Sequence, residues 1–497
     1  MQKHFRFLTI VLIAALLVLL SPNLSIQAQD ENLVVYQEVS GKLYSIPAAG
    51  GESTLLTPEN VSVQFYQVAA SGNVVYLASD GFLYSVPVTG GKTKQLNPES
   101  VQSGSIQVSH DGNWVVYLAQ DSNYETHLVS SPTFGGVPTD LVPENQTIDF
   151  NPYEIHTFYF ITADSQHVLF TSRNNRGVFH LFAVPVEGGE AVQVSDRLAS
   201  GGNVVGVWVS DDDVVYLADQ TADEDYGLFH TTLAGGTSTQ LNPSSVQLAD
   251  STPFAITPDG SRLIYQVSDG MFDYQFFSVS LTGGEPTPLT EMVRIPNFYF
   301  VPGTDQIIVG SENILSAIVT PTGEQTPVTP YRYPCCIVSP AGEHMLVKGY
   351  PPGVNSGTTA PSLYTYAIES GALSELTHGD LPLLNWTAFF SPDGNQVVFV
   401  ETDANGINQF YSAPADGSSP AVHLNAYPGS AYFSNYRMGI TIDSSTLIYI
   451  NDEEAQNFAD LYSVPVTGGE VTRLTSDDSE GVQSFQLYPP GTAWNPS

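Results

Sequence analysis

Cysteine is almost absent from this sequence. The only two among 497 residues are the neighbours Cys335 and Cys336. Adjacent Cα atoms lie about 3.8 Å apart, less than the span of about 4.4 to 6.8 Å that a disulfide normally bridges. Only a strained vicinal bridge could join the two, so the composition excludes a disulfide framework. We predict two buried free thiols, since free cysteine packs as a small hydrophobe. On a strand the two side chains would face opposite sides, which disfavours a paired metal site.

Long hydrophobic runs are missing beyond the first 28 residues. The one apolar run, Leu8 to Leu20, is 13 residues long and is followed by Ser21 to Ala28. A membrane-spanning helix needs about 20 apolar residues, whereas a basic start, a short apolar core and a small residue at the cleavage point are typical of a secretory signal peptide. We expect residues 1–28 to be removed and the mature chain to begin at Gln29; a retained membrane anchor is the alternative.

The N-terminal region also indicates the localisation of the protein. No cysteine lies near the expected cleavage point, so a lipid anchor is not expected. Nothing later in the sequence resembles a membrane span, and stable membrane insertion is not expected either. We predict a mature protein that is secreted or periplasmic.

Basic residues are also scarce. The chain has 14 Lys and Arg against 51 Asp and Glu, a net charge of -37. Without Lys3 and Arg6 of the predicted signal peptide, the count is 12 against 51, or -39. A field of this sign repels phosphate backbones and anionic lipid surfaces. It excludes nucleic acid as a partner and favours basic partners or divalent cations.

No segment shows a sustained helical period, and one phrase recurs from end to end instead. Its clearest copies read LYSIPAAGG, LYSVPVTGG, LFAVPVEGG and LYSVPVTGG, and they begin at Leu43, Leu83, Leu181 and Leu461. Weaker copies begin at Leu128, Leu228, Phe276, Ile314, Leu363 and Phe410. Successive copies are about 40 to 53 residues apart, which is close to the period of propeller blades.

Each repeat unit contains two predicted hairpins. The Gly-Gly pair supplies the positive φ angles of a tight turn, and a short strand such as Gln95-Leu96 follows it. Upstream, Ser391-Pro392-Asp393-Gly394 and its variants form another turn, in which Pro presets φ and Asp bonds to the local backbone. Two hairpins give four strands, the content of one blade. The sequence predicts an all-β fold, a β-propeller of about ten four-stranded blades over residues 29–497.

The two ends of the repeat array bear on how the ring closes. Single rings usually have four to eight blades, so two smaller propellers, divided near Val293 to Arg332, are the alternative. The first unit begins at Leu33 with its second strand, and the segment Val482 to Gly491 resembles the first strands of other units. We predict that this C-terminal strand completes the first unit and closes one ring, since that pairing removes two exposed sheet edges.

These motifs carry a family resemblance. The Ser-Pro-Asp-Gly turn, the apolar strand after it and the Leu-Tyr-Ser-Val-Pro phrase with Gly-Gly resemble the PD40, or WD40-like, repeat of TolB-like propellers. The resemblance covers nearly all of residues 32–491 and implies the propeller fold. The same unit occurs in the propellers of prolyl-oligopeptidase-type peptidases. We expect no α/β segment before the first repeat, so TolB's role in envelope assembly is not carried over, and we expect no hydrolase domain after or around the propeller.

The sequence contains none of the common catalytic motifs. A Gly-x-Ser-x-Gly elbow, a His-Glu-x-x-His helix, a phosphate loop and a dinucleotide fingerprint are all missing. We therefore assign no catalytic and no cofactor-binding residue. His127 and His180 share the repeat position before the third-strand apolar residue, which indicates a solvent-facing edge because its other occupants are mixed: Lys42, Phe82, Gln275, Gln409 and Asp460.

The loops between the second and third strands hold the densest acids. They are Asp219 to Asp225, Asp403 with Asn405 and Gly406, and Asp452 to Glu454. None has the spacing of a twelve-residue calcium loop. Solvated loops are the main expectation and a structural calcium ion is the alternative, so metal ligands stay unassigned. The insertion Lys348 to Ser362, rich in Pro, Gly, Ser and Thr, is expected to be an exposed loop; a plain surface excursion is the main expectation and a recognition loop is the alternative.

Three classes of function remain open. The leading hypothesis is an exported, non-catalytic scaffold whose rim or axial mouth recognises a protein, peptide or glycan. The alternative is an exported propeller enzyme, a polysaccharide lyase or hydrolase with an axial active site, and the third is a structural cell-surface repeat protein. An enzyme requires a deep pocket with several convergent titratable groups. The sequence predicts neither the ligand nor the oligomeric state.

Overall fold

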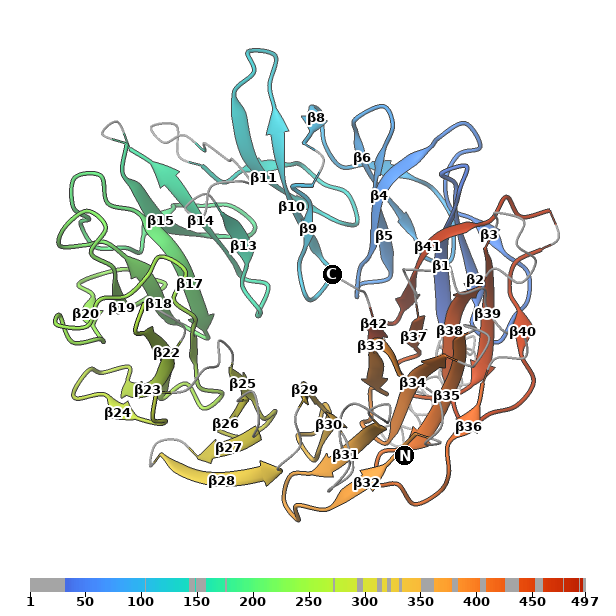
Figure 1. The fold of residues 1–497 in the computed structure, drawn as a ribbon. Helices are drawn as coiled ribbons and strands as arrows, with labels where there is room; N and C mark the ends of the chain where they lie inside the picture. Colours follow the sequence, from blue (N-terminus) through green and yellow to red (C-terminus); the bar gives the residue numbers. More distant parts are fainter. Residues whose placement is uncertain are drawn as a thin grey trace, which may run out of the picture.

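A computed structural model shows strands arranged as sheets around one axis (Figure 1). Within the described residues the strands form ten antiparallel sheets, which we call blades 1 to 10. None of these residues forms a helix long and apolar enough to cross a membrane. The structure describes residues 32–102, 104–142, 148, 158–174, 177–270, 273–292, 298–310, 315–319, 323–329, 333–349, 362–377, 383–402, 408–424, 438–451, 459–476, 478–490 and 492–494.

Each of blades 1 to 5 begins at the axis with its innermost strand. From the axis outward, blade 1 has β41 (Val482–Tyr488), β1 (Leu33–Glu38), β2 (Leu43–Pro47) and β3 (Thr54–Leu55); blade 2 has β4 (Val63–Val68), β5 (Asn73–Ala78), β6 (Leu83–Pro87) and β7 (Lys94–Gln95); blade 3 has β8 (Ser100–Val101) with β9 (Gln107–Val108), then β10 (Trp114–Gln120), β11 (Thr126–Pro132) and β12 (Thr139–Asp140); blade 4 has β13 (Tyr159–Ile161), β14 (His167–Arg173), β15 (Phe179–Pro185) and β16 (Val192–Gln193); blade 5 has β17 (Val204–Ser210), β18 (Asp213–Ala218), β19 (Gly227–Thr232) and β20 (Thr239–Gln240).

Blades 6 to 10 repeat this order. Blade 6 has β21 (Phe254–Ile256), β22 (Arg262–Ser268), β23 (Tyr274–Ser280) and β24 (Thr287–Pro288); blade 7 has β25 (Phe298–Phe300), β26 (Gln306–Gly310), β27 (Leu315–Val319) and β28 (Glu324–Thr329); blade 8 has β29 (Tyr333–Val338), β30 (His344–Gly349), β31 (Ser362–Ala367) and β32 (Leu373–Glu375); blade 9 has β33 (Leu383–Phe390), β34 (Gln396–Thr402), β35 (Asn408–Pro414) and β36 (Val422–His423); blade 10 has β42 (Thr492–Trp494), β37 (Met438–Ile440), β38 (Thr446–Asn451), β39 (Asp460–Pro465) and β40 (Thr472–Arg473).

The predicted turns confirm the repeat. Gly90 and Gly91 have φ angles of 85° and 132°, and Gly394 of the Ser-Pro-Asp-Gly turn has 76°. Because consecutive strands are antiparallel, the turns between the first and second and between the third and fourth strands lie at one face of the ring. The loops between the second and third strands, with the connections between blades, lie at the other.

Apolar packing between neighbouring blades forms the core. Ten clusters of buried side chains each join two consecutive blades of the described part. The last cluster joins Val34 and Ile46 of blade 1 to Ile448 and Leu461 of blade 10. The strands between them are apolar on both faces because each blade is covered on both sides.

These clusters decide between one ring and two. Blade 7 is the proposed point of division, and it packs on both neighbours: Ile307 lies in a cluster with Phe276 of blade 6, and Ile308 in one with Met345 of blade 8. The protein is therefore a single β-propeller, and the alternative of two smaller propellers is wrong.

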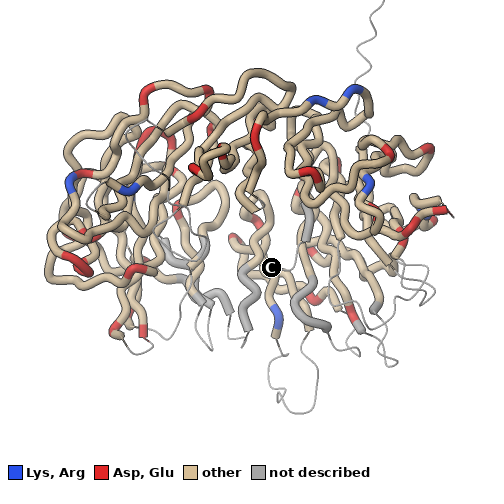
Figure 2. The backbone as a smooth tube through the Cα atoms, turned by 90° about the horizontal axis from the view of Figure 1, so that it is seen from above, with Lys and Arg blue, Asp and Glu red and all other residues tan. Residues whose placement is uncertain are grey.

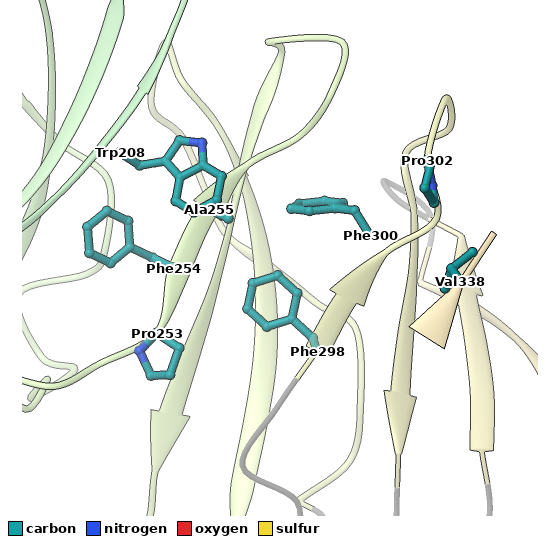
Figure 3. Close-up of a pocket in the computed structure, with 8 residues that line it drawn as sticks. All are labelled: Trp208, Pro253, Phe254, Ala255, Phe298, Phe300, Pro302 and Val338. Atoms are coloured by element: carbon teal, nitrogen blue, oxygen red, sulfur yellow. The ribbon is translucent and has the colours of Figure 1, made fainter. Parts of the chain in front are cut away.

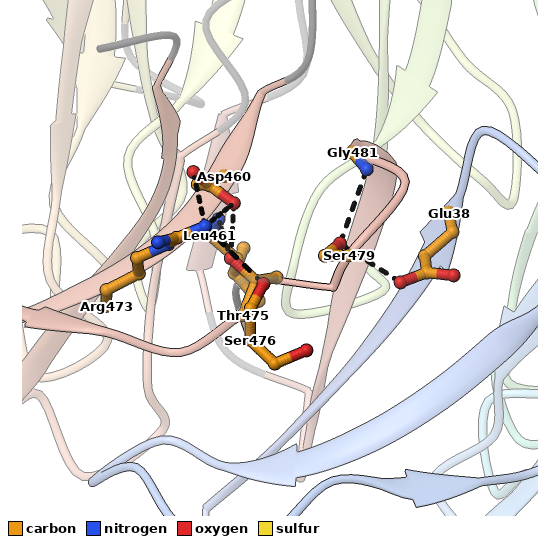
Figure 4. Close-up of polar contacts among 8 residues, drawn as sticks. All are labelled: Glu38, Asp460, Leu461, Arg473, Thr475, Ser476, Ser479 and Gly481. Atoms are coloured by element: carbon orange, nitrogen blue, oxygen red, sulfur yellow. Dashed lines mark hydrogen bonds and ion pairs between the residues drawn. The ribbon is translucent and has the colours of Figure 1, made fainter. Parts of the chain in front are cut away.

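The C-terminal strand closes the ring as predicted. β41 pairs antiparallel with β1, with Leu487 opposite Val34 and Phe485 opposite Tyr36. Leu487 is buried and Phe485 is half-buried. The Val39 N–H also donates to the Gly481 carbonyl at 2.9 Å, and the Ser479 hydroxyl donates to the Glu38 carboxylate at 3.0 Å (Figure 4).

Side-chain amides lock the closing strand to the next blade. Gln486 of β41 accepts a hydrogen bond from the Val68 N–H at 2.7 Å and donates to the Tyr66 carbonyl at 3.0 Å, both on β4 of blade 2. Gln107 of β9 donates in the same manner to the Tyr159 carbonyl of blade 4 at 2.9 Å. Such contacts join inner strands that do not share a sheet.

Two local features differ from the sequence expectation. The pairing of β29 with β30 passes from Pro334 directly to Ile337, so the backbone at Cys335 and Cys336 forms a bulge rather than part of a regular ladder. Their side chains lie outside the described part, and the predicted burial of both thiols stays a prediction. The fifth strand of blade 10, β42, was not predicted at all.

Acidic side chains outnumber basic ones in the structure, as the composition indicates. Asp and Glu occur around the whole ring, and Lys and Arg are few (Figure 2). One of the few ion pairs joins Arg473 Nη2 to Asp460 Oδ2 at 3.0 Å in blade 10 (Figure 4). Thr475 also donates to Asp460 at 2.7 Å. These contacts order the outer part of blade 10, next to the closing strand.

Candidate functional site

The inner strands of blades 5 to 8 form a pocket of about 500 Å³ (Figure 3). Four consecutive blades supply its lining from strands that stand nearest the axis: β17, β21, β25 and β29, with the turn after β25. The lining residues are Trp208, Pro253, Phe254, Ala255, Phe298, Phe300, Pro302 and Val338.

Strand alternation explains why Trp208 faces this pocket. Its neighbours Val207 and Val209 pack into the cluster between blades 4 and 5. Successive side chains of a strand point to opposite faces, so Trp208 points toward blade 6. Its exposed fraction is 42%, high for a tryptophan on a strand.

A glycine brings the next aromatic ring close to β17. A Cβ at Gly206 would lie 3.2 Å from Cε1 of Phe254, closer than side chains normally approach. The bulge in β17 falls between Val204 and Gly206. This position therefore holds the Phe254 ring against the inner strand of blade 5.

The other two rings are held by edge contacts. Phe298 and Phe300 meet at 5.7 Å between centroids and 86° between planes. Phe298 also meets the fully buried Phe276 at 5.6 Å and 71°. Edge-to-face contacts add about 0.5 to 1.5 kcal/mol each beyond area burial, so these contacts favour the observed orientation of both half-buried rings.

The side chains that line the pocket indicate which chemistry it can support. None of its eight residues has an ionisable side chain. General acid–base or nucleophilic chemistry requires such groups within hydrogen-bond reach of the substrate. Aromatic faces and proline rings instead bind apolar surfaces by contact. The arrangement suits binding.

The acidic loop Asp219 to Asp225 is the one predicted loop that falls largely within the described part. Asp219 is buried and accepts hydrogen bonds from the backbone N–H groups of Asn203 and Glu224. Burial raises the pKa of its carboxyl, against these hydrogen bonds. Its oxygens therefore hold the loop together. The acids at 403 and 452–454 lie outside the described residues, as does 350–361 of the predicted insertion.

A different trio of possible ligands lies in blade 3. Ligand atoms of Asp121, Glu125 and His127 lie within 4.8 Å of one another. Asp121 already accepts from the Asn123 and Glu125 N–H groups at 2.9 and 2.8 Å. His127 Nδ1 lies 2.6 Å from Asp140 Oδ2, and this hydrogen bond raises the pKa of His127. Asp121 and His127 are therefore already engaged in hydrogen bonds within blade 3.

His180, the second histidine at this repeat position, is half-buried. Its Nδ1 lies 3.4 Å from the Ser195 hydroxyl, and burial lowers the pKa of its imidazole. Neither histidine lies in the aromatic pocket. Sequence reasoning missed the pocket because strand alternation alone does not tell which face of an inner strand points to which blade. A tryptophan two residues after Gly206 is the one signal that the sequence offers.

Comparison with known proteins supports the assignment of the fold. No protein family model matches the sequence, and no curated protein does. A solved structure described as a eukaryotic initiation factor is 12% identical, with a TM-score of 0.53; the match covers 80% of this chain and 96% of that one. At this identity the likeness shows the fold alone.

Two weaker likenesses carry no argument by themselves. Porphyromonas gingivalis dipeptidyl peptidase 4 is 9% identical with a TM-score of 0.44, covering 78% of this chain and 64% of that one. A putative TolB from Agrobacterium tumefaciens is 12% identical with a TM-score of 0.27, covering 53% of this chain and 90% of that one.

Proposed function

We propose that the chain is an exported, non-catalytic binding protein of the PD40 repeat class, which holds its ligand in the aromatic pocket at the propeller axis. The observation that carries this is the pocket lining, in which Trp208, Phe254, Phe298 and Phe300 share one concave surface and none of the eight described lining residues is ionisable. Rigid aromatic rings give large contact area at low entropic cost, and they dominate binding energy at protein surfaces.

The enzyme alternative has less support from this lining. A polysaccharide hydrolase commonly needs two carboxylates about the scissile bond, and a lyase needs at least a general base that abstracts a proton from the sugar. The eight lining residues can make apolar contacts with a ligand, but none of them has a side chain that transfers protons. A polar active site elsewhere on the axis would have to use residues outside this pocket.

Charge narrows the ligand class. With 51 acidic against 14 basic residues, the protein repels polyanions and attracts neutral or basic ligands. A protein, a peptide or a neutral glycan fits these conditions, and nucleic acid does not. Export rests on the predicted signal peptide of residues 1–28; mass spectrometry of secreted protein should show Gln29 at the N-terminus, and an intact Met1 on membrane-bound protein would refute it.

The pocket is tested by aromatic substitution. Wild-type protein is screened against immobilised neutral glycan and peptide libraries, and each ligand found is measured by calorimetry against Trp208→Ala and Phe254→Ala. Loss of a binding hot spot costs about 2 kcal/mol or more, so each variant should bind roughly thirtyfold more weakly.

The matched control is Phe134→Ala. Phe134 is 54% exposed in a turn of blade 3, far from the pocket lining. This variant should bind like the wild type. If Trp208→Ala and Phe254→Ala bind as tightly as Phe134→Ala, the pocket is not the binding site.

A further inference from the structure

The last strand of the chain crosses from blade 1 to the inner edge of blade 10. After β41, the segment Thr492–Trp494 forms β42, which pairs antiparallel with β37. Thr492 lies opposite Ile440 and Trp494 opposite Met438. β42 also contacts β33, the inner strand of blade 9. Figure 1 shows β42 on the axial side of the ring.

Blade 10 differs from the other blades in this respect. In the described part of the chain, the inner strands β4, β13, β17, β21, β25, β29 and β33 each stand at the edge of their sheet, and only β37 has a further strand on its axial side. An edge strand presents unpaired N–H and C=O groups that can template another strand.

We propose that the inner edge of β37 is a docking site for an extended peptide, and that Thr492–Trp494 is its built-in occupant. A partner's segment binds by the same antiparallel strand addition and displaces the tail. The tail pairs with a strand other than the one that closes the ring, so it can leave while β41 stays in place. Because the tail is uncharged and the protein is strongly acidic, the incoming segment is a neutral or basic peptide.

This site is independent of the aromatic pocket. The pocket belongs to blades 5 to 8, and the β37 edge belongs to blade 10. The two proposals therefore fail separately: Trp208→Ala changes the pocket and leaves the β37 edge intact.

The tail peptide itself tests the site. A labelled peptide of residues 489–497 (PPGTAWNPS) is titrated by fluorescence polarisation into the full chain and into a chain that ends at Gly491. A tethered tail competes at an effective concentration of about 1 mM. For a peptide that binds the shortened chain at about 10 μM, competition should weaken binding to the full chain roughly a hundredfold.

Two controls separate strand pairing from adhesion. The first control is a peptide with proline at positions 492 and 493. Successive N–H groups of a strand point to opposite sides, so one of these two residues donates to β37, and proline has no N–H to donate. This peptide should not bind. A full-length variant with Thr492→Pro and Ala493→Pro should bind the native peptide as the shortened chain does, and so should the shortened chain carrying Trp208→Ala. Equal binding of the native peptide to the full and shortened chains, or no binding to either, overturns the proposal.

Discussion

A single polar residue joins the third and fourth strands in six blades of the described part. In blade 5, Asn242 Oδ1 accepts a hydrogen bond from the Leu228 N–H at 2.8 Å, and Asn97 does the same for Leu83 at 2.7 Å. The same position is filled elsewhere by Thr57, Ser195, Thr290 and Thr475, each 14 residues after its donor. The sequence shows these residues as strand ends, but their role was not predictable because the donor lies on another strand.

Removing this acceptor should destabilise the blade. Asn242→Ala leaves the buried Leu228 N–H without its partner, which costs about 1 to 3 kcal/mol, whereas Asn242→Thr keeps an acceptor that other blades use. Urea unfolding should give a free energy of unfolding that falls for the alanine variant and largely recovers for the threonine variant. Equal losses for the two variants would show that the hydroxyl or amide oxygen has no such role.

At the scale of elements, the first turn of each unit was predicted best. Asp393 accepts hydrogen bonds from the Ser391 hydroxyl and the Asn395 N–H, as expected for a Ser-Pro-Asp-Gly turn. Its own N–H donates to Ser444 of the next blade at 3.0 Å. Local chemistry dictates the turn, so the sequence reveals it; the contact between blades depends on tertiary packing and was not visible.

Aromatic pairs within the blades were also predictable only in part. Tyr76 stacks on Tyr84 across β5 and β6 at 5.5 Å, and Phe399 stacks on Tyr411 at 5.7 Å. The repeat phrase shows that aromatics recur on both strands, but register, and hence the pairing, came only with the structure. β42 escaped prediction because three residues that pair through their backbone need no side-chain pattern.

The turn aspartates predict acid sensitivity. Burial by itself would raise the pKa of Asp393, but hydrogen bonds from Ser391 and Asn395 outweigh it and hold the pKa below its ordinary value. The pKa values of Asp111, Asp164 and Asp443 are lowered by the same balance, and that of Asp259 chiefly by its hydrogen bond from Ser261.

The sign of the pH effect follows from these shifts. A carboxyl whose pKa is lower in the folded chain stabilises the fold above the unfolded value of about 3.9, and this stabilisation is lost as pH falls through the folded pKa. The melting temperature should therefore drop below about pH 4. Asp393→Asn should show a smaller drop between pH 5 and pH 3 than the wild type; an identical drop in the two proteins would mean that this turn does not contribute.

At the scale of the whole molecule, the fold was predictable and the site was not. About ten similar units in register indicate a propeller. A first strand missing from the N-terminal unit and a leftover first strand at the C-terminal end indicate closure, since both rest on repetition along the chain. The pocket depends on which residues of four inner strands converge, from Trp208 to Val338, and no repeat marks them. Function follows those non-repeating residues, as it generally does on shared folds.

The pairing of β41 with β1 closes the ring, because it joins blade 1 to a strand from the C-terminal part of the sequence. Its loss would remove several ladder hydrogen bonds at about 1 kcal/mol each and expose the buried Val482 and Leu487 at about 1.5 to 3 kcal/mol each. A typical domain has about 5 to 15 kcal/mol in total. The first and second blades would also lose the contacts of Gln486.

The most direct measurement compares the thermal unfolding and gel-filtration elution of two shortened chains, one ending at Gly481 and one ending at Gly491. A ring closed by β41 predicts that the chain ending at Gly491 melts and elutes like the full protein, and that the chain ending at Gly481 melts at a markedly lower temperature or aggregates through its exposed β1 edge. A chain ending at Gly481 that melts and elutes like the full protein would contradict the closed ring.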